Sequence, residues 1–257
     1  MSIHTKLRWP AFQNVTRFVL GNALHASFSI HYGGLEHIPS DGPLLLAANH
    51  ITWLDPFVIG LGVERLHFGM GKEEYYFWPG MRYVLGWLGA FPVARKKKYP
   101  VLLQKYSKER VDKYLLADNQ FNYDEYFKGK QDVVLDIKKT LRHDERLTGI
   151  SIAQYLLMKN EALIIHPEGT RHCDGIIRDC KTGVARIVLD LYQLYGVQTT
   201  VVPCAVAYAP RGFRSNITVQ FGVPIAVKGT VDSFTECLEQ KIKELYAVAY
   251  AAANSGA

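Results

Sequence analysis

A histidine and an aspartate five residues apart, His50 and Asp55, have the side chains of a proton-transfer pair. A carboxylate that binds one imidazole nitrogen fixes the tautomer and stabilises the charged ring, so the other nitrogen can take a proton from an alcohol. Such a pair usually activates a serine, but the sequence has no Gly-x-Ser-x-Gly turn. The nucleophile is therefore expected to be a substrate hydroxyl that attacks an activated acyl group. Taken alone, such a pair is more often structural.

A second polar segment, His166–Arg171, reads His-Pro-Glu-Gly-Thr-Arg. Its glycine lets the backbone approach a ligand closely, and its arginine offers a planar fork that suits phosphate. Glu168 can hold a sugar or glycerol hydroxyl. The alternative is a plain turn between a strand and a loop.

Both segments directly follow short apolar runs, residues 43–48 and 162–166. In open α/β sheets, ligand-binding and catalytic groups gather at the carboxyl ends of the strands. A spacing of five would put His50 and Asp55 well off one face of a regular helix. We therefore expect a turn between strand and helix to bring them together.

Short apolar runs alternate with helical patterns along most of the chain. Strands are expected at residues 43–48, 66–71, 90–94, 162–166, 200–207 and 217–221. Helices are expected around residues 52–63, 102–116, 131–142, 150–159, 182–195 and 232–252. Ser233 and Glu236 predict a capping box at the start of the last helix. The alternation predicts an α/β fold: one domain over residues 1–257, with a mostly parallel central sheet flanked by helices.

The N-terminal segment, residues 1–32, is expected to contain an amphipathic helix. Polar residues break its apolar runs before they reach the ~18 residues of a membrane span. The helix is expected either to pack on the core or to lie in a bilayer interface, and the basic residues Lys6, Arg8 and Arg17 favour lipid. The apolar side chains that recur near helical spacing are Trp9, Phe12, Val15, Val19, Leu24 and Phe28.

Residues 96–145 lack strand patterning and are rich in Lys, Asp and Tyr. They predict a helical insertion. Three roles are open for it: a solvated excursion on the surface, a lid over an acyl site or a basic membrane contact. The net charge of +6 over 257 residues points to anionic partners. The basic residues are dispersed and form no nucleic-acid-binding motif, so nucleic acid is not an expected partner. The four cysteines fit no common zinc pattern, and no metal is expected.

Together the two polar segments resemble the glycerophospholipid acyltransferase superfamily, and in particular the bacterial 1-acylglycerol-3-phosphate acyltransferases. The family pattern is Asn-His-x-x-x-x-Asp, present here at residues 49–55, followed by Pro-Glu-Gly-Thr-Arg at residues 167–171. The resemblance covers roughly residues 33–225. Further segments that agree in order are residues 71–74, 89–95, 174–175, 181–183 and 202–206.

The resemblance implies an O-acyltransferase that makes phosphatidate from 1-acylglycerol-3-phosphate. His50 would deprotonate the acceptor hydroxyl and Asp55 would orient His50 and balance its charge. Acyl-coenzyme A or acyl-acyl carrier protein would be the donor, and no cofactor is needed because the thioester is already activated. Backbone amides near the two segments would hold the developing oxyanion.

The resemblance also implies an acceptor site. Arg171, with Lys72 and Arg95, would hold the acceptor phosphate. The residues that would bind substrate are Lys72, Arg95, Glu168, Gly169, Thr170 and Arg171. The expected partners are a phospholipid surface, a lysophospholipid and the acyl donor. The expected location is peripheral, at the cytoplasmic face of a membrane.

Two residues depart from the family pattern. His166 stands where the family usually has Phe or a similar apolar residue, and His172 where it usually has Ser. These departures leave another acceptor open: a different lysophospholipid, an amino-acid lipid or a glycolipid. A transacylase or hydrolase that needs no soluble thioester is a second alternative, and a non-catalytic lipid-binding module is a third.

Overall fold

The computed structural model describes residues 7–94, 99–116, 118, 120–142, 146–209 and 215–255. The chain divides into two compact units. The smaller unit comprises Met1–Gln13 and Phe68–Leu156, and the larger comprises Asn14–His67 and Leu157–Ala257. Both segments with predicted chemistry belong to the larger unit.

Five strands of the larger unit lie side by side in the order β1-β7-β6-β2-β5. β1 pairs in parallel with β7, and β2 pairs in parallel with both β6 and β5. Only the β6–β7 pair within this group is antiparallel. The strands span Ser29–Gly33 (β1), Leu44–Ala48 (β2), Ala162–Ile165 (β5), Thr200–Tyr208 (β6) and Asn216–Phe221 (β7). The predicted α/β fold with a mostly parallel sheet is confirmed.

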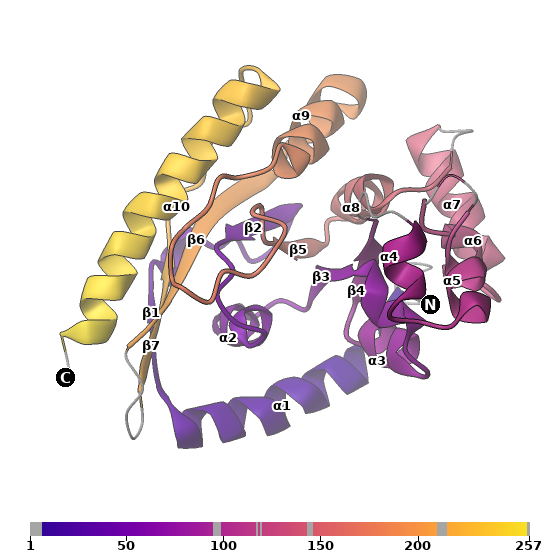
Figure 1. Ribbon diagram of the computed structural model, residues 1–257. Coiled ribbons are helices and arrows are strands. Elements are labelled where there is room, and N and C mark those ends of the chain that lie inside the picture. Colours follow the sequence, from indigo (N-terminus) through magenta and orange to yellow (C-terminus); the bar gives the residue numbers. More distant parts are fainter. Residues whose placement is uncertain are drawn as a thin grey trace. The chain divides into compact units, whose positions relative to one another are not determined.

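The neighbouring strands β2 and β5 are apolar on both faces. β2 and β5 are buried at every position, as expected for parallel strands that helices cover on both sides. One face packs on α2 (Asp55–Gly62), with Leu44, Leu46 and Ala48 of β2 in that cluster. On the other face α10 (Val231–Asn254) packs along β6 and β7 (Figure 1). α9 (Gly183–Tyr195) contacts α10.

The cap of α10 differs from the predicted one. Thr230 is the N-cap residue, and its side chain accepts a hydrogen bond from the Ser233 backbone. The Ser233 hydroxyl in turn accepts from the Thr230 backbone, so the box is closed by Thr230 and Ser233 and not by Ser233 and Glu236. The helix therefore begins at Val231, because a serine at the third helical position reaches back to the cap as glutamate would.

The predicted N-terminal helix is α1, Pro10–Ser27. The predicted range of 1–32 extends too far, because residues 29–33 form β1. One side of α1 packs on the core through Leu24 and through Gly21, where an added Cβ would lie 2.9 Å from Leu61 Cδ2. Val15 and Val19, predicted for the same apolar stripe, are instead exposed together with Phe18.

The smaller unit contains β3 (His67–Lys72) and β4 (Ala90–Val93), which pair in parallel. Its further elements are η3 (Glu73–Phe77), α3 (Met81–Trp87), α4 (Tyr99–Leu103), α5 (Lys108–Tyr114), α6 (Tyr123–Tyr126), α7 (Gln131–Leu141) and most of α8 (Gly149–Met158). The predicted insertion, residues 96–145, is thus helical where it is described. The single helix expected at 102–116 is two, because Ser107 is extended and starts α5.

None of the helices in the described part of the chain combines the length and the apolar character that crossing a membrane requires.

Candidate active site

The turn between β2 and α2 brings His50 and Asp55 together, as the sequence predicted. His50 Nδ1 lies 2.8 Å from Asp55 Oδ2. The same oxygen accepts the backbone N–H groups of Ile51, at 2.6 Å, and Thr52, at 2.8 Å. Asp55 is the first residue of α2, so its carboxylate closes the turn and binds the ring at once. With Nδ1 committed to Asp55, Nε2 is the nitrogen available to a substrate.

The other carboxylate oxygen of Asp55 meets two hydroxyl groups that the sequence did not point to. Tyr208 Oη donates to Asp55 Oδ1 at 2.6 Å, and Thr52 Oγ1 donates to it at 3.0 Å. Asp55 is fully buried, and burial alone would raise its pKa. Hydrogen bonds from His50 and Tyr208 outweigh burial and hold the pKa of Asp55 below its usual value. The carboxylate therefore stays ionised beside the imidazole.

Asn49 anchors the turn to the neighbouring strand. Its side-chain amide donates to the Val206 carbonyl at 3.0 Å, and its side-chain oxygen accepts the Val206 N–H at 2.8 Å. Asn49 is fully buried, and these two bonds continue the pairing of β2 with β6 after the last paired residue, Ala48. The position of His50 is thus fixed from β6 as well as from its own turn.

His166 lies directly against His50. Its ring stacks on the His50 ring, with centroids 4.0 Å apart and planes 10° apart. His166 Nδ1 donates to the carbonyls of Ala48, at 3.0 Å, and Asn49, at 2.9 Å, which fixes the tautomer. Burial first, and then the neighbouring His50, lower the pKa of His166 to about 4, so the ring is neutral at physiological pH.

Glu168 joins the second segment to the first. Its Oε1 accepts the His50 backbone N–H at 3.0 Å, while the side chain is only 2% exposed. Its Oε2 is buried and has no hydrogen-bond partner among the described residues, and His172 Nε2 lies 3.7 Å away. Burial raises the pKa of Glu168 to about 7, although the hydrogen bond from the His50 backbone opposes this. The oxygen is therefore positioned to bind a ligand hydroxyl.

Comparison with known proteins identifies the family of the chain. The sequence matches the Acyltransferase family over residues 29–121 and 129–207, which include both segments. The chain belongs to this acyltransferase family. A structure with a similar fold is that of the 1-acyl-sn-glycerophosphate (LPA) acyltransferase PlsC from Thermotoga maritima. The TM-score is 0.53 at 14% identity, and the match covers 90% of this chain and 77% of that one. No curated protein matches in sequence.

The family membership confirms the predicted superfamily and the predicted enzyme class, an O-acyltransferase. The roles of individual residues in this acyltransferase stay predictions. The loop 166–172 follows β5, which pairs with β2, so both segments leave the sheet at the carboxyl ends of neighbouring strands.

Glycine is required at position 169 of this loop. Gly169 has φ of +70°, in the left-handed region, and an added Cβ would lie 2.7 Å from Lys181 Nζ. The Lys181 backbone N–H donates to the Pro167 carbonyl at 2.9 Å, which folds the following segment back on the loop. Lys181 is thus a cation beside the predicted acceptor site. From the sequence, it was only part of the segment 181–183 that agrees with the family pattern. Thr170 and Arg171 follow Gly169 on the same loop.

The structure does not test the remaining two predicted binding residues. Lys72 is the last residue of β3 and belongs to the smaller unit. Arg95 lies outside the described residues. Their predicted contact with an acceptor phosphate stays a prediction.

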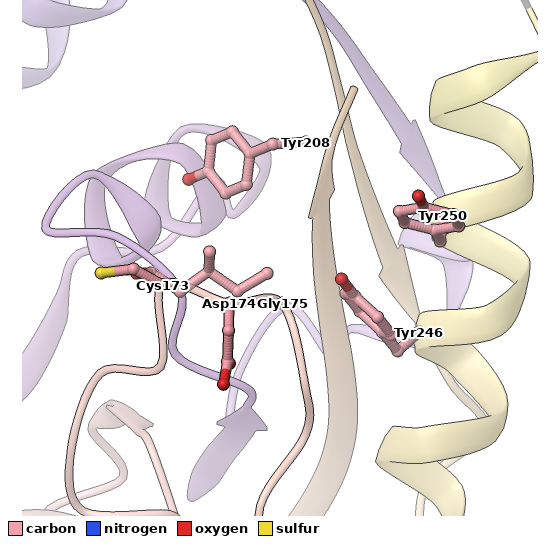
Figure 2. Close-up of a pocket in the computed structure, with 7 residues that line it drawn as sticks. Cys173, Asp174, Gly175, Tyr208, Tyr246 and Tyr250 are labelled. Carbon is pink, nitrogen blue, oxygen red and sulfur yellow. The ribbon is translucent and has the colours of Figure 1, made fainter. Parts of the chain in front are cut away.

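A pocket of about 400 Å³ lies beside the catalytic turn. Figure 2 shows Tyr246 and Tyr250, which extend from α10, together with Tyr208 and the segment Cys173–Gly175. Ile51, the residue after His50, completes the lining. The lining residues include three tyrosines and one carboxylate but no lysine or arginine, so this pocket lacks the charge that a phosphate group needs.

Among the described residues, no group of three or more His, Cys, Asp or Glu side chains is arranged to hold a metal ion.

Proposed function

We propose that this acyltransferase moves a fatty acyl group from acyl-coenzyme A or acyl-acyl carrier protein to the hydroxyl of 1-acylglycerol-3-phosphate, giving phosphatidate. His50 takes the proton of the acceptor hydroxyl through Nε2, and Asp55 stabilises the imidazolium that forms. The hydroxyl oxygen then bonds to the thioester carbonyl, the carbon–sulfur bond breaks, and the thiol leaves with the proton. None of these reaction steps needs a cofactor.

The single observation that carries the proposal is the His50–Asp55 contact of 2.8 Å. It is made at the carboxyl end of a parallel strand, in a family of acyltransferases. The His50 side chain is 17% exposed while Asp55 is fully buried, so a substrate can reach the base and not its partner. A general base with this arrangement is typically worth ~10²–10⁴-fold in rate.

The acceptor is proposed to bind over the loop 166–172. Glu168 Oε2 is suited to the glycerol hydroxyl because it is buried and lacks a hydrogen-bond partner among the described residues. Gly169 and Thr170 shape the backbone at that point, and Arg171 holds the phosphate together with Lys72 and Arg95. PlsC, which has a similar fold, is an acyltransferase for 1-acyl-sn-glycerophosphate.

A second acceptor class is supported by the tyrosine-lined pocket. Its lining includes three tyrosines and no basic side chain, and its one carboxylate, Asp174, already pairs with Arg178, which favours a head group without a phosphate monoester. The chemistry at His50 would be the same, and only the acceptor would differ. An amino-acid lipid or another lysophospholipid fits this description.

We further propose that the protein is peripheral and binds the cytoplasmic face of a membrane through α1. Phe18 is 74% exposed, and Val15 and Val19 lie beside it on the side of α1 away from the core. In the smaller unit, Trp78, Tyr83 and Trp87 are also exposed, and such rings favour a membrane interface. The cytoplasmic face is where a soluble acyl thioester is available.

The proposal is tested by acyl transfer with purified protein. Radiolabelled acyl-coenzyme A and acyl-acyl carrier protein are offered separately, with lysophosphatidate and a panel of other lysolipids as acceptors. Selective formation of phosphatidate supports the proposal, and product from another lysolipid alone moves the assignment to the second acceptor class. A folded protein that transfers from neither donor, or a folded His50→Ala variant with near-normal activity, contradicts the mechanism.

Arg171→Ala distinguishes the two acceptor classes. If the acceptor carries a phosphate monoester, loss of the guanidinium raises the acceptor KM by about tenfold or more, with a smaller change in the donor KM. An unchanged acceptor KM indicates that a phosphate is not bound there.

A further inference from the structure

The carboxylate of Asp55 is held by five donors, and only one of them is the base. Three donors reach Oδ2: His50 Nδ1 and the backbone N–H groups of Ile51 and Thr52. The remaining two, Tyr208 Oη and Thr52 Oγ1, reach Oδ1. These two hydroxyl groups are also 3.0 Å from each other. The side of the carboxylate away from the base is therefore a closed cluster of hydroxyls.

Tyr208 comes from a different element than the rest of the cluster. It is the last residue of β6, and β6 pairs in parallel with β2. Since β2 leads into the turn that carries His50, the Tyr208 bond joins the carboxyl ends of two adjacent strands. Thr52 Oγ1 also accepts the Leu54 N–H at 3.0 Å, and this hydrogen bond within the turn stabilises it.

This arrangement has a consequence for the strength of the base. A carboxylate that receives a strong hydrogen bond on Oδ1 holds less negative charge on Oδ2. It therefore attracts the proton of His50 less strongly, and it cannot rotate away from the ring. Removing the Oδ1 donors would free the carboxylate to bind the imidazolium more tightly.

We propose that Tyr208 is a positioning residue which, with Thr52, fixes the Asp55 carboxylate and thereby sets the proton affinity of His50. The reading of His50 as a base rests on the proposed function, but the effect on its ring does not need turnover. Tyr208 touches neither acceptor nor donor in this role and acts only through Asp55.

Other ionisable groups also face the His50–Asp55 pair, and substitution of Tyr208 does not alter them. They come from the loop after β5 and from β6. They are His166, Glu168, His172 and Cys204. Because none of them binds Asp55 Oδ1 in the described structure, substitution of Tyr208 leaves their hydrogen bonds in place.

The experiment is an NMR titration of the His50 ring in Tyr208→Phe, with the resonance assigned through His50→Gln. The pH midpoint of the titration is expected to move upward by about half a pH unit or more, as for loss of one hydrogen bond to a charged group. Tyr246→Phe is the matched control, because Tyr246 lines the same pocket and no described hydrogen bond joins it to Asp55. Its midpoint should equal that of the wild type.

Thr52 supplies a second test should Tyr208→Phe not fold. Thr52→Val removes the other Oδ1 donor and should move the midpoint in the same direction, whereas Thr52→Ser should restore it. In the transfer assay, Tyr208→Phe should lower kcat about tenfold with little change in the KM of either substrate. The acid side of its pH–rate profile should move to higher pH. A midpoint unchanged in Tyr208→Phe, or moved equally in Tyr246→Phe, overturns the proposal. A protein that lacks acyl transfer but shows the shift overturns the proposed function instead.

Discussion

The two turns that leave the neighbouring strands β2 and β5 differ in how completely their buried polar groups are satisfied. In the turn after β2, Asp55 is fully buried and every oxygen of its carboxylate is hydrogen-bonded. In the loop after β5, Glu168 Oε2 and His166 Nε2 are buried without a hydrogen-bond partner among the described residues. A buried polar atom without a partner costs free energy unless a ligand or water satisfies it, which agrees with the proposed binding of the acceptor over the loop after β5.

Under the proposed function, the first turn holds the base in a fixed position, and the second loop keeps hydrogen-bonding capacity for the acceptor. The hydrogen bonds to Asp55 hold its pKa low, whereas burial raises the pKa of Glu168 to about 7. Asp55 is thus expected to stay ionised at neutral pH, whereas Glu168 changes charge near neutral pH. Substitution of Asp55 should therefore affect mainly the transfer rate, and substitution of Glu168 should affect mainly the pH dependence of stability and the binding of the acceptor.

The largest effect is expected for Asp55→Asn. An amide cannot accept hydrogen bonds at both former oxygens, and it removes the charge that stabilises the imidazolium. The transfer rate should fall by ~10²–10⁴-fold. Asp118→Asn is the control, since Asp118 is exposed and its described contacts are an ion pair with Arg146 and a hydrogen bond from the Gln120 backbone. Equal activity of the folded Asp55 variant and the wild type would remove the distinction between the two turns.

Glu168→Gln should make the protein more stable at high pH. A pKa raised from 4.5 to about 7 means that the folded state keeps this proton after the unfolded state has lost it. Stability from this group therefore falls as pH rises from about 4.5 to 7. Glutamine keeps an oxygen for the His50 N–H and cannot ionise. The variant should gain about 2 kcal/mol over wild type between pH 5 and 8 in denaturant unfolding, and a difference that stays flat with pH would contradict this.

His166 is expected to act through its ring and not through its charge. His166→Phe keeps a flat ring against His50 and should retain activity within about threefold, whereas His166→Ala removes the stack and should cost about tenfold. Transfer rates of the two variants, measured side by side, test this. Equal losses in both would show that the Nδ1–H bonds to Ala48 and Asn49 matter more than the stack.

The smallest effect should come from Gly169→Ala, which forces a Cβ into a left-handed conformation beside Lys181. The expected loss is about 1–2 kcal/mol in free energy of unfolding. Gly183→Ala is the control, because nothing lies within 4 Å of its added Cβ and α9 begins there. That variant should be neutral or slightly stabilised.

Local pattern was enough to locate much of the fold and the centre of the site. Apolar runs bounded by polar segments predicted β2 and β5, because parallel strands covered on both faces are continuously apolar. A spacing of five was enough to predict a turn between His50 and Asp55, which the structure contains. The strand β1 was missed because it follows α1 directly and its apolar residues continue the helical pattern.

The tertiary structure decided the contacts between residues that are distant in sequence. Tyr208 lies 153 residues from Asp55 and Glu168 lies 118 from His50, so no local spacing relates them. The stack of His166 on His50 likewise depends on the pairing of β5 with β2. The sequence by itself determined which side chains are candidates for the chemistry, because residue type and local spacing suffice for that. Strand order decided which side chains hold His50 and Asp55 in place, because hydrogen bonds form between neighbours in space.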